Sequence, residues 1–348
     1  MSIAKTNEMK KILIITFMVL STILANGQNP DFLKMVEYGI KAPSGHNTQP
    51  WKFRLNENSV DVYPNFSKEL PVIDVNHREL YISLGCAVEN ICIASNEFGY
   101  SCQVEIIKQD SLSFIRIELQ KSDVDKNPLF DQIDKRQTNR SVYKSKSIQT
   151  NAIDELKKLN ISKPVSIYFY PKGESDFLKL CEFIYRGNEM LFTDKDFKIE
   201  LLDWMRFNSG HAQKERDGLA YNVLGSPSLP KWIGRPVVKS FLTPKTQNKT
   251  EKEKLNSSSH LVLIATQENT VDNWILAGIT LERFFLKCTK LGISVAFSNQ
   301  PCEVNTLADE VRKQIAIDNN YPMLLMRIGY ADPMPYSVRK ELKDVIIE

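Results

Sequence analysis

Two long segments of the chain repeat apolar residues at steps of three and four. Between positions 77 and 99 this period predicts an amphipathic helix that ends at Gly99, because glycine commonly follows the last helical turn. Between positions 271 and 291 the same period predicts a second helix that ends at Gly292. Both predicted helices precede stretches rich in Val and Ile. The predicted strands are Cys102–Lys108, Phe114–Leu119, Ile293–Phe297 and Met323–Ile328, and a further helix is expected over 303–317.

The two predicted helices also resemble each other in sequence. Gly85 and Gly278, Glu89 and Glu282, and Gly99 and Gly292 each lie 193 positions apart. Glycine inside a helix costs about 1 kcal/mol relative to alanine, so its recurrence indicates that the helices approach each other closely. The recurrence favours an internal duplication. Two unrelated amphipathic helices are the alternative.

The rest of the pattern divides the chain into segments. A polar link at Ser122–Asn127 separates a first half, residues 28–125, from a second half, residues 126–348. A helix is expected to begin at Pro128 and to include Arg136. Between about 206 and 236 the pattern becomes irregular, with several Gly and Pro residues, and a loop of that length is typically functional or disordered.

The extreme N-terminus has a pattern of its own. Lys10 and Lys11 precede the apolar run Ile12–Leu24, which is followed by the small residues of Ala25-Asn26-Gly27. This order is typical of a secretory signal peptide over residues 1–27. The apolar run is too short to span a bilayer, which takes roughly 20 residues. The protein is therefore expected to be exported, to the periplasm, with no stable membrane span after cleavage; a buried N-terminal helix is the alternative.

Composition and charge exclude some functions. The chain has 348 residues, of which 25% are charged, and its net charge of +3 does not suggest a nucleic-acid partner. The basic run Lys245–Lys254 is interleaved with polar residues and is interpreted as a solvated loop. The six cysteines form no CxxC pair and are expected to be free thiols, although export would permit disulfides. The four histidines lack metal-ligand spacing, so no metal site is expected.

One turn carries candidate binding chemistry. Ala42–Trp51 contains Pro-Ser-Gly, then Asn47 and Gln49, and then Pro-Trp leading into a strand. Asn and Gln amides hold both donor and acceptor atoms and can contact the edge of a heterocycle, and Ser44 can bind a ligand carbonyl. An ordinary turn that buries Trp51 is the alternative.

A second candidate is the pair Arg136 and Arg140. On a helix these residues, four apart, would point to one place, and two bidentate guanidinium groups suit a phosphate dianion. The alternative is a solvated face on which they pair with Asp131 and Asp134.

These segments resemble three motifs of the FMN-dependent nitroreductase superfamily. Residues 42–51, APSGHNTQPW, resemble the flavin-contacting loop A-P-S-x-x-N-x-Q-P-W. Residues 133–143 resemble the R-x-S/T-x-R element that holds the FMN phosphate. Residues 329–345 resemble the terminal G-Y-x-x-P…R-K-x-L-x-x-V segment, which adds Arg339 to the phosphate site. The first motif is specific, and the other two are weak alone.

The order of the motifs departs from the usual family pattern, because here the loop precedes the arginine element. This order is similar to the fused, Acg-like branch, in which one chain imitates the usual homodimer. The resemblance implies an α+β fold of two duplicated halves with mixed sheets flanked by helices, one FMN per chain, and a monomer or weak homodimer. It implies a lid-like insertion at about 206–236. The implied FMN-binding residues are Pro43, Ser44, His46, Asn47, Gln49, Arg136, Thr138, Arg140, Gly292, Ser294 and Arg339.

The resemblance further implies flavin chemistry, with hydride from NAD(P)H passing to a nitroaromatic or quinone. No dedicated catalytic acid or base is then expected. Export would separate the protein from cytoplasmic NAD(P)H, so another electron donor is an alternative. A lid that covers the flavin would instead make the protein a flavin-sequestering one with little reductase activity. A cofactor-free interaction protein is the third hypothesis.

Overall fold

The computed structural model describes residues 29–109 and 112–348, so the predicted signal peptide lies outside the described residues. The first half of the chain forms a five-stranded sheet of order β11-β1-β2-β4-β3. Within it the C-terminal strand β11 runs parallel to β1, and the other pairings are antiparallel. Its elements are α2 (Pro30–Gly39), β1 (Trp51–Leu55), β2 (Ser59–Pro64), α3 (Arg78–Glu97), β3 (Tyr100–Gln109), β4 (Leu112–Lys121), α13 (Leu342–Val345) and β11 (Ile346–Ile347).

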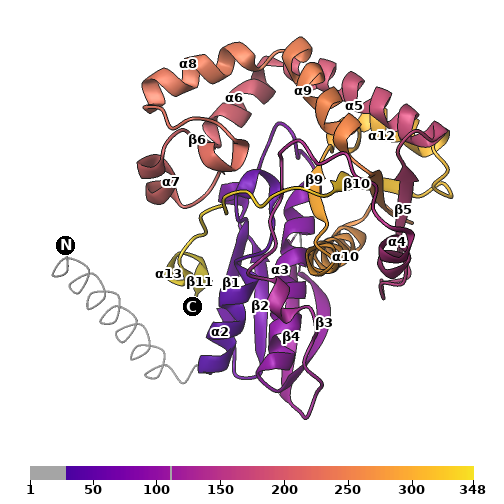
Figure 1. Cartoon of the computed structure of the whole chain (residues 1–348). Coiled ribbons are helices and arrows are strands. Elements are labelled where there is room, and N and C mark those ends of the chain that lie inside the picture. Colours follow the sequence, from indigo (N-terminus) through magenta and orange to yellow (C-terminus); the bar gives the residue numbers. More distant parts are fainter. Residues whose placement is uncertain (1–28, 110–111) are drawn as a thin grey trace.

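The second half forms a four-stranded antiparallel sheet of order β5-β8-β10-β9. Figure 1 shows α5, α9 and α12 over its outer side, with α10 on the side that faces α3. The elements of this half are α4 (Thr150–Lys157), β5 (Val165–Pro171), α5 (Ser175–Thr193), α9 (Pro244–Ser257), β8 (His260–Thr266), α10 (Val271–Lys290), β9 (Ser294–Phe297), α11 (Gln300–Glu303), α12 (Asn305–Gln314) and β10 (Tyr321–Gly329).

The two sheets share one topology. In each, the first two strands in sequence pair antiparallel, a 20-residue helix follows the second, and the next two strands pair with each other beside it. Thus β1, β2, α3, β3 and β4 correspond in order to β5, β8, α10, β9 and β10. The chain also crosses between the halves, because β11 from the C-terminus completes the edge of the first sheet (Figure 1).

The long helices α3 and α10 pack against each other through glycines. A Cβ added at Gly85 would lie 2.1 Å from the carbonyl oxygen of Ile275, and one added at Gly278 would lie 2.0 Å from that of Ile82. The two contacts are reciprocal, because Gly278 lies 193 positions after Gly85 and Ile275 lies 193 positions after Ile82. No other residue fits at either position, and the backbone contact joins both halves in one apolar core.

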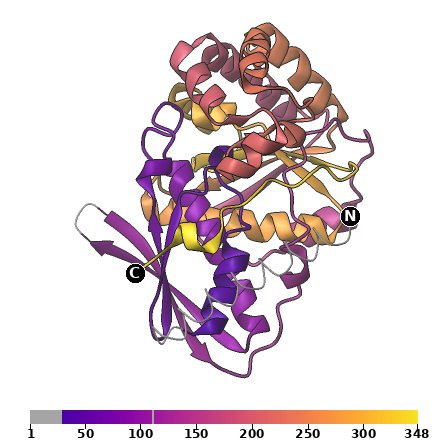
Figure 2. The same ribbon diagram turned by 90° about the vertical axis from the view of Figure 1, so that its left-hand side faces the viewer.

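Smaller elements between α5 and α9 form a cap at one end of the molecule, toward the top of Figure 2. They are α6 (Lys195–Asp203), β6 (Met205–Arg206), α7 (Ser209–Glu215), β7 (Leu219–Ala220), the short 3-10 helix Tyr221–Leu224, and α8 (Lys231–Phe241), with β6 and β7 paired in parallel. No described helix is both long and apolar enough to cross a bilayer.

Most elements predicted from periodicity are confirmed. The helices end before Gly99 and Gly292, which have φ of +75° and +67°, as the glycine signal indicates. The strands 102–108, 114–119, 293–297 and 323–328 all lie within or along observed strands, and the helix expected over 303–317 is α12, which is shorter at both ends.

Two predictions were wrong. The helix expected from Pro128 is only a 3-10 turn, Phe130–Gln132, and the chain then extends so that Thr138 bridges to Val295 of β9. Pairing with a strand far along the same half therefore overrides local helix propensity. The basic run 245–254 is not a loop but part of α9, because Thr243 caps the helix start and buried Leu255 anchors its end.

Candidate functional site

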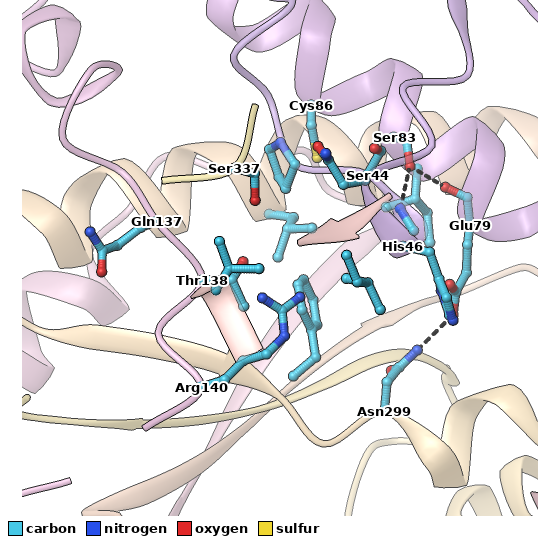
Figure 3. Close-up of a pocket in the computed structure, with 18 of the residues that line it drawn as sticks. Ser44, His46, Glu79, Ser83, Cys86, Gln137, Thr138, Arg140, Asn299 and Ser337 are labelled. Carbon is cyan, nitrogen blue, oxygen red and sulfur yellow. Dashed lines mark hydrogen bonds between the residues drawn. The ribbon is translucent and has the colours of Figure 1, made fainter. Parts of the chain in front are cut away.

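One cavity of about 450 Å³ lies where the two halves and the cap meet. The loop after α2 and the start of α3 form one side, and the extended segment 133–140 with the C-terminal segment 335–339 forms another. Figure 3 shows Thr138 and Arg140 across the cavity from Ser44, His46 and Glu79. The volume falls in the range of ligand pockets, about 300–1,000 Å³.

The loop after α2 is held in an uncommon conformation. His46, Asn47 and Gln49 all have positive φ, between 48° and 57°, which is rare for residues other than glycine. The Ser44 hydroxyl accepts a hydrogen bond from the Gln49 amide at 3.0 Å, and the Ser44 carbonyl accepts one from Asn47. Backbone strain of this kind costs about 1–3 kcal/mol per residue and is typical of ligand-binding segments.

The side-chain amides of Asn47 and Gln49 are hydrogen-bonded to backbone groups of the cap and the C-terminal segment. The Asn47 amide donates to the carbonyls of Gly218 and Val338, and the Gln49 amide donates to that of Arg216. Gln49 Oε1 in turn accepts from the Lys340 amide. Asn47 lines the cavity and Gln49 does not. Both amides therefore fasten the cap and the C-terminal segment to the loop.

His46 lines the cavity as a neutral side chain. Burial, followed by the nearby cation of Arg140, lowers its pKa from 6.5 to about 4. At neutral pH it can exchange hydrogen bonds with a ligand but carries no charge.

Arg136 is buried and already paired. Its Nη2 donates to the Lys41 carbonyl at 2.7 Å, and its Nε lies 3.3 Å from Oε1 of the fully buried Glu282. Arg339 donates to the carbonyls of Lys41 and Ala42 and to Asn47 Oδ1, while its own Nε has no partner. Burial, followed by the charge of Arg136, lowers the pKa of Arg339 to about 9. These two cations share one region of the wall.

Arg140, like Arg339, is a cavity cation without an ion-pair partner among the described residues. In the described part of the chain no carboxylate lies within ion-pair distance of its guanidinium. Burial, followed by repulsion from Arg327, lowers its pKa from 12.5 to about 10. Because it lies on an extended segment, it does not converge with Arg136 as a helix would require. A buried cation with no carboxylate beside it is a ready partner for an anionic ligand group.

Two acidic side chains, which sequence reasoning missed, form another part of the wall. Asn299 Nδ2 donates to Glu79 Oε1 at 2.8 Å and to Glu303 Oε1 at 3.2 Å. Burial, followed by the adjacent Glu303 carboxylate, raises the pKa of Glu79 well above its usual range, and burial raises that of Glu303. The two glutamates are 224 positions apart in helices of different halves, so no sequence spacing could have paired them.

The remaining wall is apolar. Side chains from α5, α6 and the cap segment 219–223 supply one part, and α3, α10, β9 and β10 supply another. Such a lining suits a flat aromatic ring system. The apolar wall residues are Ile82, Cys86, Leu191, Phe192, Phe197, Leu201, Leu219, Val223, Leu281, Phe297 and Leu324.

The cap is fastened beside the cavity by one buried carboxylate. Asp217 accepts from Arg206 at 2.6 Å and lies 3.0 Å from the ammonium groups of both Lys68 and Lys340. Burial opposes its ionisation, but the hydrogen bonds from these three cations hold its pKa below the usual value. The adjacent Gly218 amide donates to the Asn47 carbonyl. We call this arrangement the Asp217 latch.

The structure thus brings most of the candidate residues together around one cavity. Those that line it are Pro43, Ser44, His46, Asn47, Arg136, Thr138, Arg140 and Arg339. Gly292 and Ser294 do not line it: Gly292 ends the turn after α10 in open space, and Ser294 pairs with Gly329 at the start of β9. The part of β9 that reaches the cavity is Phe297.

Comparison with known proteins finds distant relatives of this chain. No family model matches the sequence. Two Mycobacterium tuberculosis sequences, from strains CDC 1551 and H37Rv, carry the provisional name NAD(P)H nitroreductase; each is 23% identical over 316 residues, covering 88% of both chains. The chain is thus similar to these two sequences over most of its length.

Some solved structures show a limited likeness to this chain. The FMN-dependent nitroreductase NfnB of Mycobacterium smegmatis, in complex with NADPH, aligns with a TM-score of 0.39 and 15% identity over 61% of this chain and 94% of its own. The FMN- and NADPH-dependent nitroreductase NfnB of a Sphingopyxis strain aligns with a TM-score of 0.40 and 11% identity over 64% of this chain and 99% of its own.

Proposed function

We propose that this protein is an FMN-dependent oxidoreductase whose flavin occupies the cavity between the two halves. The observation that carries the proposal is the position of Arg140, a buried cation without a carboxylate partner, opposite the strained loop at Ser44 and His46. Arg140 would hold the phosphate, and the unpartnered Nε of Arg339 lies apart from it, in the region of Arg136. The apolar wall from α5, α6 and residues 219–223 would contact the ring system.

FMN, when bound, supplies hydride and electron transfer, and the protein supplies position and charge. The neutral imidazole of His46 and the hydroxyl of Ser44 are the polar groups that can orient a ring edge. Burial and the neighbouring carboxylate raise the pKa of Glu79, and burial raises that of Glu303, so this pair holds protons more readily than free carboxyl groups do. We propose NAD(P)H as hydride donor, as in the names of the relatives, and a nitroaromatic or quinone as acceptor.

The protein is further proposed to be a fused pseudo-dimer of the Acg-like branch. The identical order of strands in the two sheets and the reciprocal glycine contacts of α3 and α10 support a duplication. A fused chain of this kind would bind one FMN and need no second copy, so we propose a monomer or weak homodimer. Export through the segment 1–27 to the periplasm is proposed from the sequence alone.

One observation favours a second function. The Asp217 latch and the bonds of Asn47 and Gln49 hold the cap closed beside the cavity. A flavin below a closed cap would be shielded from nicotinamide, and the protein would then sequester flavin with little reductase activity.

Two measurements test these functions in order. The purified mature protein should show flavin absorbance and release about one FMN per chain, as expected for one complete site. Colourless protein that does not take up added FMN would exclude both functions. Yellow protein mixed anaerobically with NADPH should then bleach rapidly if it is a reductase, whereas persistent colour would favour sequestration.

A further inference from the structure

The outer face of helix α8 exposes large apolar side chains at the end of the cap. Trp232 is 79% exposed, Phe241 58% and Val237 41%, although most residues of these types are buried in this protein. Figure 1 places α8 at the outer edge of the cap, away from both sheets. We call the exposed surface of Lys231–Phe241 the α8 face. Contiguous exposed apolar groups on a protein surface commonly mark a binding surface.

The inner side of α8 fixes which residues point outward. Gly234 lies against the Phe207 ring, where a Cβ would come within 2.7 Å, and Val238 packs on the apolar cluster of the cap. Arg235 pairs with Asp203 at 2.8 Å. Trp232, Pro236 and Lys239 then recur at steps of four and three on the opposite side, as the helical period requires. The exposure of Trp232 is therefore set by packing on the inner side.

The α8 face is also strongly cationic. Residues 218–250 contain no Asp or Glu but hold Lys231, Arg235, Lys239, Lys245 and Lys249, although the whole chain carries a net charge of only +3. Only Arg235 has an ion-pair partner among the described residues; the four lysines have none. Exposed Trp232 and the unpaired Lys239 thus lie on the same side of α8, Lys231 adjoins Trp232, and Lys245 and Lys249 follow in α9.

We propose that the α8 face binds the surface of an anionic phospholipid bilayer. The lysines would be attracted to lipid phosphates, and the Trp232 ring would enter the headgroup boundary, which accommodates amphipathic aromatic groups. A second copy of the chain fits less well, because two faces of the same positive charge repel each other. A nucleic acid would attract the lysines, and the DNA competition below distinguishes it from a lipid surface.

The test uses the full-length mature protein and sedimentation with lipid vesicles. Protein should pellet with vesicles of phosphatidylcholine mixed with phosphatidylglycerol and stay in the supernatant with pure phosphatidylcholine. Added salt should weaken the binding, because it screens charge. Equal binding to both vesicle types, or binding to neither, would overturn the proposal.

Paired variants locate the surface. Lys231→Gln and Lys239→Gln should each lower partition onto the anionic vesicles about fivefold. Trp232→Ala should lower it about tenfold. Lys158→Gln with Lys163→Gln is the matched control, since both lysines are exposed and lie near α4, far from α8 in Figure 1. Circular dichroism checks that each variant is folded; all three substituted side chains of α8 are exposed, so none should unfold the protein.

Other occupants of the α8 face give distinct results. If Trp232→Ala converts a dimer to a monomer in sedimentation velocity while vesicle binding is absent, the face is a self-association surface and the lipid proposal is wrong. If short duplex DNA competes the protein off the vesicles at equal phosphate concentration, the face prefers nucleic acid and the proposal is also wrong. Retention on anionic vesicles in the presence of that DNA supports it.

Discussion

Oε1 of Glu282 lies 3.3 Å from Nε of Arg136, and both side chains are almost fully withdrawn from solvent, at 0% and 3% exposure. Glu282 belongs to α10, in the second half, and Arg136 donates to the Lys41 carbonyl of the first half. One buried ion pair therefore joins the long helix, the arginine segment and the loop beside the cavity. Because Arg136 is paired with Glu282 and the Lys41 carbonyl, it is less available to a ligand than Arg140.

The first prediction concerns the stability role of this pair. Arg136→Ala should lower the free energy of unfolding by about 3 kcal/mol, because it leaves the Glu282 carboxylate buried without its cation. Urea unfolding monitored by circular dichroism measures the loss. The double variant Arg136→Ala with Glu282→Gln should be more stable than Arg136→Ala alone. If the losses in free energy of unfolding of the single variants Arg136→Ala and Glu282→Gln add up to that of the double variant, the two side chains do not interact.

Arg140→Ala should behave in the opposite way. It removes a buried cation that has no carboxylate partner, so the free energy of unfolding should not fall, but FMN should bind about tenfold to a hundredfold more weakly. Equilibrium dialysis against FMN measures the dissociation constant. Arg140→Lys keeps the charge without the bidentate guanidinium and should give an intermediate value. Wild-type affinity in a folded Arg140→Ala protein would place the phosphate elsewhere.

Stability should also depend on pH through Glu282. Burial, opposed by the charge of Arg136, raises its pKa from 4.5 to about 7, so between these values the folded protein holds more protons than the unfolded chain. This contribution is complete below pH 4.5 and is lost as the pH rises to about 7, on the order of 3 kcal/mol. Glu282→Gln cannot titrate. Melting temperatures of both proteins across this range should therefore diverge, and a constant difference would contradict the shifted pKa.

The sequence predicted the long helices and most strands beside them because those elements bury regular apolar faces. The three-and-four period of residues 77–99 and the glycines that end each helix are local signals, and both were sufficient. The segment 128–140 failed because its conformation is set by a partner 157 positions away, in the bridge from Thr138 to Val295. Local propensity contains no information about such pairing.

In the site, too, local motifs were predictable from the sequence and contacts between distant residues were not. The loop Ala42–Trp51 and the arginines were located by motif, and in the structure they lie around one cavity. The roles of individual amides were not predictable, because the partners of Asn47 and Gln49 are backbone groups of Gly218 and Lys340, which no motif specifies. Glu79 and Glu303 were missed for the same reason: their proximity arises only when the two halves assemble.

The glycine contact between the long helices gives a further prediction. Gly85→Ala should abolish folding or lower the free energy of unfolding by several kcal/mol, about 3 or more, because its Cβ would lie 2.1 Å from a backbone oxygen that cannot move independently. Gly210→Ala is the matched control within a helix. Its nearest atom would be 3.5 Å away, so the change should be neutral or stabilise by up to about 1 kcal/mol. Thermal melts compare the two, and similar melting temperatures would mean that α3 and α10 are not in close contact.

The last prediction separates a reductase from a flavin store through the Asp217 latch. Asp217→Asn keeps the shape of the side chain but removes the charge that holds Arg206, Lys68 and Lys340. Hydrogen bonds to charged groups contribute about 1.5–3 kcal/mol each, so losing them should populate open forms of the cap at least tenfold more. Limited proteolysis should then cut residues 205–230 faster.

Anaerobic mixing of the flavin-loaded variant with NADPH gives the functional readout. If the closed cap limits access, bleaching of the flavin should be about tenfold faster in Asp217→Asn than in the wild type. Asp203→Asn is the control, because it breaks only the exposed pair with Arg235, and such surface pairs contribute about 0–1 kcal/mol. Faster proteolysis without faster bleaching would show that the cap opens but does not control access. The latch would then stabilise the cap and have no part in catalysis.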